Sequence, residues 1–375
     1  MPKWILTVFL REKTEQEEDL PAFLSGGIMK KDLGISPENC GISGIKYSGI
    51  GGQAVLEGVM MRNKEDYAVA VRKSDGSIEV LKAEYKGIVG NEKVYKIPIL
   101  RGMLSFIDSL VLGMKALNYS SDLYMEETEE SASQVTEEKA SQMMEEKASQ
   151  AAEEKIPKKE EKDSQGVLTV IVTIVAVMLA LGLFMVLPYF LSLLFKGFIT
   201  NDYLLALVEG IIRLLIFVAY IKLISRMEDI RRVFMYHGAE HKCINCIESG
   251  MDLTVDNAEK ASREHRRCGT SFLLYVMVIS ILFFALINVP NRVMKVLLRL
   301  ALIPVIAGVA YEFIRLAGRS TNPVIQALSV PGLWMQKLTT SEPDRAMLEV
   351  AIRSVEEVFD WKQYLEENFR SGKKE

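Results

Sequence analysis

All three histidines of this 375-residue chain, and three of its four cysteines, lie in one short stretch between residues 235 and 272. They are His237, His241, His265, Cys243, Cys246 and Cys268. Imidazole and thiolate groups are common ligands of zinc and related divalent metals. Random placement would rarely bring six such residues into about a tenth of a chain. The stretch therefore predicts a divalent metal site, with zinc as the favoured ion.

One interpretation starts from the pattern H-x-x-E-H, which His237, Glu240 and His241 form. Histidines four apart on a helix present two imidazoles to one ion, as in the inverted zincin pattern. Glu240 could then act as a general base toward water activated by the metal. A further ligand is needed, and the candidates are His265, Cys268 and Glu312. The pattern is short, but it predicts a catalytic site with Glu240 and Glu312 as its acidic residues.

A second interpretation uses the thiols. Cys243-x-x-Cys246 and His265-x-x-Cys268 are separated by eighteen residues, a spacing close to that of structural Cys₃His zinc sites. Four protein ligands would close the site and only hold the segment together. The spacing alone leaves catalytic metal, structural zinc and no metal as alternatives.

Four apolar stretches surround this segment, at residues 167–195, 203–225, 271–289 and 294–317. Each is long enough to be a transmembrane helix, and four in series indicate a multi-pass membrane domain over residues 166–318. The His/Cys segment, residues 226–270, then forms the loop between the second and third spans. Ion pairs are expected within the spans, between Glu209 and Arg213 and between Glu312 and Arg315, because an isolated charge in hydrocarbon is costly.

Basic residues predict the orientation of these spans. The loop at residues 226–270 is rich in Lys and Arg, whereas the two other short loops hold only Lys196, Arg292 and Lys295. Positive loops stay in the cytoplasm. We therefore expect a bacterial cell-membrane protein with both termini and the metal site on the cytoplasmic side.

The remaining chain divides into four parts. Residues 1–47 read as a poorly ordered extension without the features of a signal peptide. Residues 48–124 predict a cytoplasmic unit with a β-hairpin around Asp75 and Gly76, followed by an amphipathic helix that lies in the membrane interface or packs in the core. Residues 125–165 repeat EEKASQ and predict a charged linker. Residues 319–375 predict interfacial helices and an amphipathic C-terminal helix.

Composition limits the partners. Lys and Arg number 45 against 49 Asp and Glu, so no strong field indicates nucleic acid binding. The few cysteines beside histidines suit a reducing compartment rather than a disulfide framework. The expected partners are the lipid bilayer and an integral membrane protein, as partner or as substrate.

Several segments resemble the YqhQ family of bacterial membrane proteins: GGQAVLEGVMMR, LRGMLSFIDSLVLGMKALNYS, YHGAEHK, HRRCGTSFLL, YEFIRLAGR and PGLWMQKLTTSEPD. They follow one another from about Gly51 to about Val358. The family is described as a domain of unknown function and a predicted metal-dependent enzyme. The resemblance implies that His237, Glu240, His241, His265 and Cys268 match its pattern, whereas Cys243 and Cys246 depart from it. It therefore favours ligation by His237, His241 and Cys268, with His265 or Glu312 as a further ligand.

The sequence thus predicts a mainly α membrane protein with four transmembrane helices and a small cytoplasmic α+β unit. The expected function is a membrane-embedded metal-dependent enzyme, a hydrolase at the cytoplasmic face acting on a peptide segment or a lipid head group. The alternative is a non-catalytic accessory protein of an integral membrane complex, in which the metal only braces the loop. An open coordination position on the metal would favour the enzyme. A transporter is a third interpretation, because charged residues lie within the second span.

Overall fold

The computed structural model describes residues 46–90, 94–146, 171–172, 174–176, 178–287, 289, 292–320 and 322–370. Every described residue belongs to one compact unit, Cys40–Glu375. Residues 1–45 of the expected N-terminal extension and residues 147–165 of the expected linker lie outside the described residues. Within this unit the fold is mostly helical with one small sheet.

The sheet is a four-stranded antiparallel meander in the order β1-β2-β3-β4. Its strands are β1 (Gly51–Val55), β2 (Gly58–Asn63), β3 (Asp66–Arg72) and β4 (Ile78–Glu84). The predicted hairpin is confirmed as β3 and β4, whose register pairs Arg72 with Ile78. Gly76 lies in the turn with a φ of 87°, a left-handed conformation that glycine adopts without strain.

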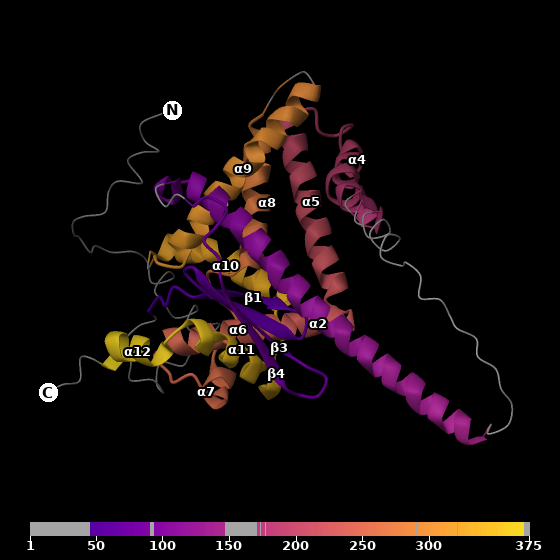
Figure 1. Ribbon diagram of the computed structural model, residues 1–375. Helices are drawn as coiled ribbons and strands as arrows, with labels where there is room; N and C mark the ends of the chain where they lie inside the picture. The colour runs from indigo at the N-terminus through magenta and orange to yellow at the C-terminus, as the bar shows by residue number, and fades with distance from the viewer. Residues whose placement is uncertain are drawn as a thin grey trace. The chain divides into compact units, whose positions relative to one another are not determined.

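Helices cover both faces of this sheet (Figure 1). Side chains alternate between the faces of a strand, so Met61 and Ala68 enter one core while Met60 and Val69 enter another. The first core contains α6 (Glu228–Glu248) and α11 (Arg345–Val358). The second contains α2 (Leu100–Glu146). The sheet with α6 and α11 forms the layer that carries His237 and His241.

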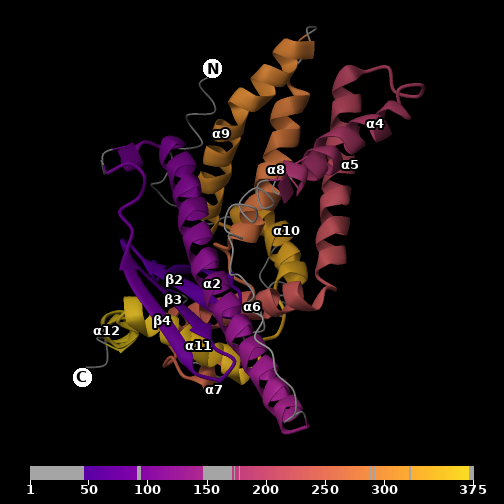
Figure 2. The same cartoon turned by 45° about the vertical axis from the view of Figure 1, so that its right-hand side comes forward.

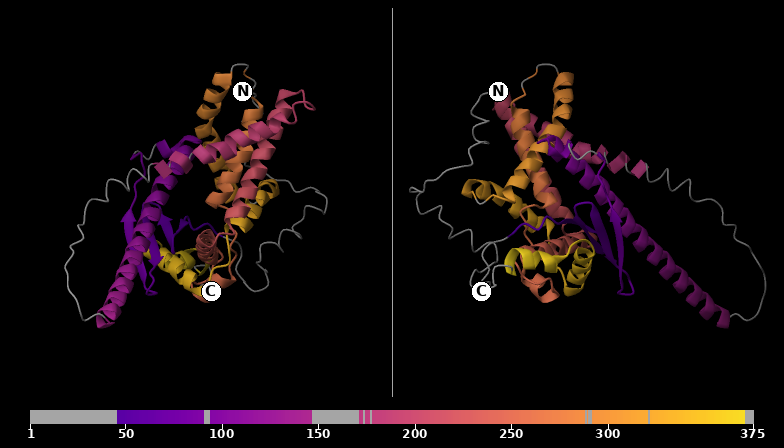
Figure 3. Two further views of the ribbon diagram at one scale, coloured as in Figure 1. Left: turned by 90° about the vertical axis from the view of Figure 1, so that its right-hand side faces the viewer. Right: turned by 60° about the vertical axis from the view of Figure 1, so that its left-hand side comes forward.

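Helix α2 buries a different face from the one that its apolar residues predict. Leu112 and Ala116 pack on the sheet, while Leu110 and Met114 are 52% and 64% exposed. One face of the helix is thus part of the core, as one of the two expectations had it, and the position in a membrane interface stays a prediction. The helix continues to Glu146, beyond the point where the linker was expected to begin, and runs past the sheet (Figure 3). The sequence after Gly113 is rich in Ala, Glu, Gln and Met, which favour helix. It contains no Pro or Gly up to residue 146.

Three described helices are long and apolar enough to cross a membrane: Ile174–Leu193, Asp202–Ile224 and Leu297–Ala317. The first includes η2 (Gly182–Val186) and α4 (Leu187–Leu193), the second is α5, and the third lies within α9 (Arg292–Ala317). The remaining expected span corresponds to α8 (Gly269–Ala285), which is shorter at 17 residues. That length spans about 26 Å at 1.5 Å per residue, slightly less than a hydrocarbon core of about 30 Å.

These apolar helices pack side by side, with α8 in contact with both α5 and α9 (Figure 2). The predicted pair between Glu209 and Arg213 is confirmed at 2.8 Å, and Arg299 of α9 lies 3.5 Å from the same carboxylate. The bundle therefore neutralises much of its internal charge by pairing.

The segment at residues 226–270, expected as a loop, is largely helical. It contains α6 and α7 (Val255–Lys260). The other elements are η1 (Val94–Lys96), α10 (Pro323–Thr339), α12 (Trp361–Leu365) and η3 (Glu366–Arg370). Helix α10 contacts α8, α9 and α5, so the chain after the last apolar helix folds back beside the bundle. The predicted C-terminal amphipathic helix is α11, which packs its buried face on β2, β3 and α6.

Candidate metal centre

The central group consists of His237, His241 and Cys268. One ligand atom from each lies within 4.8 Å of the others, and no other group of this kind occurs among the described residues. The two histidines are one turn apart on α6, so their imidazoles point the same way, with ring centroids 4.4 Å apart. Cys268 is the N-cap residue of α8 and approaches from the apolar bundle. The site therefore joins the sheet layer to the bundle.

Backbone carbonyls fix both imidazoles. Nδ1 of His237 lies 2.9 Å from the carbonyl oxygen of Thr339, and Nδ1 of His241 lies 2.6 Å from that of Arg263. A carbonyl oxygen only accepts, so each Nδ1 must carry a proton and donate it. The Nε2 atoms are left as ligand atoms. This is the arrangement in which proteins hold metal-binding histidines.

Charge couples Cys268 to the histidines. Its Sγ lies 3.1 Å from Nε2 of His237, and the backbone N–H of Thr270 donates to it at 3.4 Å. Burial alone would raise the pKa of the Cys268 thiol, but His237 and His241 outweigh burial and hold that pKa well below its usual value. Burial likewise opposes protonation of His237, yet the Cys268 and Glu240 charges raise its pKa to about 9. A thiolate in this setting is both a metal ligand and a nucleophile.

Glu240 lies beside this group without belonging to it. Its side chain comes from the same face of α6, and the residue is 5% exposed. Burial raises the pKa of Glu240, while the nearby His241 and His237 and the backbone N–H of Gly52 oppose that shift. A Cβ atom on Gly52 would come within 3.0 Å of the Glu240 carboxyl carbon. Only glycine lets β1 pass this close to the carboxylate.

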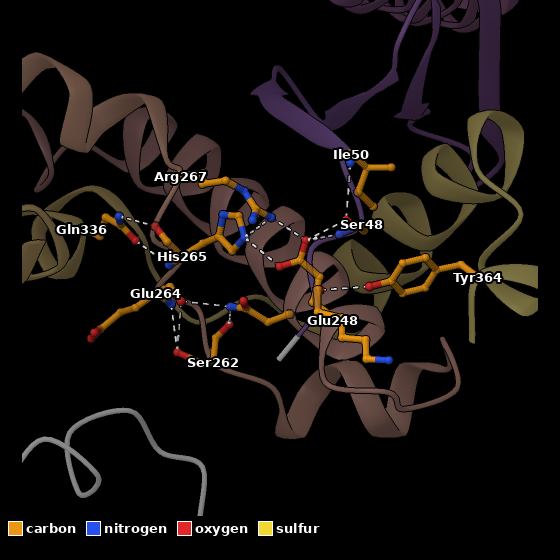
Figure 4. Close-up of polar contacts among 11 residues, drawn as sticks. Ser48, Ile50, Glu248, Ser262, Glu264, His265, Arg267, Gln336 and Tyr364 are labelled. Carbon is orange, nitrogen blue, oxygen red and sulfur yellow. Dashed lines mark hydrogen bonds and ion pairs between the residues drawn. The ribbon is translucent and has the colours of Figure 1, made fainter. Parts of the chain in front are cut away.

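His265 faces a different group (Figure 4). Its Nε2 lies 3.6 Å from Glu248 and 3.2 Å from a guanidinium nitrogen of Arg267. The side chain of Gln336 bonds to both the N–H and the carbonyl of His265, at 2.7 Å each. Burial and the charge of Arg267 lower the pKa of His265. The structure therefore places this imidazole in a neighbouring ion network, although its ring centroid is 5.6 Å from that of His241.

The other sequence candidates are also placed away from the three ligand atoms. Cys243 and Cys246 are buried in the apolar core between α6, α11 and the sheet, so the Cys₃His arrangement does not form. Burial raises the pKa of Cys243 well above its usual value, which suits a packed thiol. Glu312 forms a two-pronged ion pair with Arg101 of α2, with 2.5 Å between Nε and Oε1, instead of the expected pair with Arg315.

The family model for DUF1385, described as a protein of unknown function, matches residues 97–361. The chain belongs to this family. It is 34% identical over 323 residues to an uncharacterized protein, YqhQ, of Bacillus subtilis (strain 168), covering 85% of this chain and 94% of that protein. The expected family resemblance is thereby confirmed. No solved structure matches the chain.

Within this DUF1385 chain, Glu248 was not identified from the sequence, although it is 2% exposed and lies at the centre of the contacts beside the three candidate ligands. It accepts hydrogen bonds from the N–H and hydroxyl of Ser48, at 2.9 and 2.7 Å, and pairs with Arg267 (Figure 4). The helical spacing in the sequence could have identified Glu248. Glu248 follows His237 by eleven and His241 by seven residues, which returns it to the same face of α6.

Gly238 packs closely against the backbone that follows Thr339, the residue whose carbonyl contacts His237. A Cβ at this position would lie 2.2 Å from the backbone oxygen of Ser341. Gly238→Ala should therefore destabilise the protein by about 1–3 kcal/mol through overpacking, measured as a lower thermal midpoint. Gly182→Ala is the matched control in a helix with nothing within 4 Å of the new atom. It should be neutral or slightly stabilising, and equal losses in both variants would contradict the packing account.

Proposed function

We propose that this protein is a membrane-bound, metal-dependent hydrolase whose metal is held by His237, His241 and Cys268. The observation that carries the proposal is the convergence of three ligand atoms from two elements, on the half-buried His237 and the buried His241 and Cys268, with no fourth His, Cys, Asp or Glu among the described residues within the same distance. Catalytic zinc sites typically have three protein ligands and one open position, whereas structural sites have four.

The donor chemistry suits a divalent ion such as zinc. The raised pKa of His237 means that a metal would have to displace the proton shared between its Nε2 and Cys268, after which two neutral imidazoles and one thiolate would hold the ion. The Thr339 and Arg263 carbonyls hold both histidines in the tautomer that exposes Nε2. The lowered pKa of Cys268 favours the thiolate that a metal requires. When bound, such an ion would supply Lewis acidity toward water and a substrate carbonyl or phosphoryl group.

Glu240 is the proposed general base. Its carboxylate lies beside the histidines, and burial raises its pKa, which makes the carboxylate a stronger base than one in water. Gly52 keeps β1 against the carboxylate and excludes bulk water from that side. His265 and Glu312 are left out of the proposed mechanism, because their side chains are engaged by the Glu248 network and by Arg101.

The three long apolar helices support a location in the bacterial cell membrane. We propose that α8 is a fourth, shorter span, because it packs between α5 and α9. The basic residues between α5 and α8 then favour a cytoplasmic position for the metal centre and for both termini.

A non-catalytic accessory role is the second candidate. The observation in its favour is the exposed apolar stripe of α2, which includes Ile107, Leu110, Met114 and Leu117. Such a stripe could rest on the membrane or on a partner protein. This role would need the metal only as a brace, and a three-donor group is less suited to that purpose.

Glu240→Gln separates the two roles. The amide keeps the shape of the side chain but cannot act as a base, so the variant should retain its metal and lose activity by about 10²-fold or more. The measurement compares lipid and peptide profiles of membranes from cells lacking the gene, complemented by wild type or by the variant. The hydrolase predicts that the variant accumulates the same compound as the uncomplemented cells. A profile identical to wild type, with metal bound, would contradict catalysis and favour the accessory role.

A further inference from the structure

A cavity of about 890 Å³ lies between the start of the sheet, the first turns of α2 and the last turns of α9. Gly52, which lies against Glu240, and Arg267, which precedes Cys268, form part of its wall, and the three candidate metal ligands do not. Its size fits a small-molecule ligand. The proposed hydrolase mechanism assigns nothing to this cavity.

The cavity wall is strongly basic. Seven lysine or arginine residues line it, against the two acidic residues Glu65 and Asp108. The basic residues include Arg62, Lys64, Lys96, Arg267, Arg315 and Arg319. Asp108 accepts hydrogen bonds from the hydroxyls of Tyr85 and Tyr95 and from the N–H of Ile88, at 3.1, 2.6 and 2.8 Å. These neutral donors leave its negative charge in place, so the seven basic and two acidic lining residues give the wall an excess of five positive charges.

Two guanidinium groups are held at this wall by one aromatic ring. The guanidinium carbon atoms of Arg267 and Arg319 lie 4.0 and 5.0 Å from the ring centroid of Tyr47. Glu248 also pairs with Arg267, as Figure 4 shows. Arginine held in this way binds phosphate with little further loss of side-chain freedom.

The backbone also leaves room for a ligand. Gly49, Gly51 and Gly90 line the cavity, and a Cβ on any of them would meet nothing within 4 Å. Gly49 has a φ of 85°, so a larger residue there would be strained. The glycine-rich entry into β1 therefore presents bare backbone to the cavity, a feature of many sites that approach phosphate closely.

The position of the cavity identifies the class of ligand. Tyr311, Ile314 and Arg315 lie in the last two turns of the candidate span Leu297–Ala317, and Arg319 follows that helix. Basic pockets at the end of a membrane helix suit anionic lipid head groups. We propose that this cavity binds a phosphate-bearing anion at the membrane surface, either the head group of an anionic phospholipid or a soluble phosphate ester. This proposal does not require the metal.

The test uses detergent-solubilised full-length protein. Phosphatidylglycerol or phosphatidylcholine is added, and bound lipid is counted by native mass spectrometry. In a parallel arm, glycerol 3-phosphate is titrated and the thermal midpoint is followed. We expect preferential binding of phosphatidylglycerol, and at least about tenfold weaker binding by Arg315→Gln/Arg319→Gln, because charge-assisted hydrogen bonds are lost. Binding of glycerol 3-phosphate without a lipid preference would support the proposal and assign the ligand to the soluble source.

Lys260→Gln/Arg353→Gln is the matched control, since it removes the same charge from exposed residues outside the cavity lining. It should bind phosphatidylglycerol as wild type does. Should the arginine variant fail to fold, Gly51→Phe provides the second test, because its ring would occupy the cavity while leaving every charge in place. Equal binding of both lipids with no response to glycerol 3-phosphate, or equal losses in the control, would overturn the proposal.

Discussion

Cys268→Ser should lower the zinc affinity of the purified protein by at least about 100-fold, so that metal bound at about one ion per chain is lost on dialysis. The hydroxyl of serine is not a thiolate at neutral pH, and its removal leaves only the two imidazoles of α6 as donors. Metal content per chain is measured by inductively coupled plasma mass spectrometry after exchange into metal-free buffer.

Cys243→Ser is the matched control for this prediction. Cys243 is fully buried in the core beside the sheet, and its thiol lies outside the group of ligand atoms. This variant should retain its zinc even if it loses some stability through burial of a hydroxyl. Zinc loss in the Cys243 variant but not in the Cys268 variant would reverse our assignment of the thiol ligand.

Glu248→Gln should destabilise the protein by about 3–5 kcal/mol, because it leaves Arg267 without its buried counter-charge. It should also loosen the path of Ser48 into β1, since two hydrogen bonds from Ser48 end on this carboxylate. The change is measured as the free energy of unfolding in denaturant. Glu349→Gln is the control. The Glu349 side chain, which pairs with Arg72, is 54% exposed, so this ion pair should contribute less than about 1 kcal/mol to the free energy of unfolding.

The pH dependence checks the same carboxylate independently. Burial would raise the pKa of Glu248, but His265 and Arg267 outweigh burial and lower this pKa to about 2. A depressed folded-state pKa contributes stability that is complete above the usual glutamate pKa of about 4.5 and is lost as the pH falls toward about 2. The loss is on the order of 3 kcal/mol in wild type. Glu248→Gln should lack this component, and an unchanged acid profile would contradict the assigned role.

Local patterns explain why much of the fold was predictable. Alternating apolar residues around Asp75 and Gly76 specified the hairpin, and the long apolar stretches specified the long helices. The buried face of α2 was not predictable in the same way. Leu112 and Ala116 are buried because the sheet requires small and medium side chains at that crossing, whereas the richer apolar stripe remains outside. Tertiary packing determined this face, and helical periodicity could not reveal it.

The candidate site shows the same division. The four-residue spacing placed His237 and His241 together, and proximity in sequence suggested both His265 and Cys268 as neighbours. Only the folded structure distinguishes His265 from Cys268. His265 contacts Glu248 and Arg267, whereas Cys268 caps α8 and its Sγ lies beside the imidazole of His237. Glu312 was a candidate ligand because it is expected near the cytoplasmic end of its span. In the structure it pairs instead with Arg101 of α2, some two hundred residues earlier in the chain. Such long-range partners leave no trace in local spacing.

X-ray absorption at the zinc edge of the purified full-length protein tests the central claim most directly. Ligation by His237, His241 and Cys268 predicts about one sulfur at about 2.3 Å, about two imidazole nitrogens at about 2.0–2.1 Å, and a light-atom ligand in the fourth position. A spectrum with two or more sulfur ligands would instead place the ion at Cys243 and Cys246. Protein purified without chelators that carries no ion, and takes up none when zinc is added, would contradict the metal centre altogether.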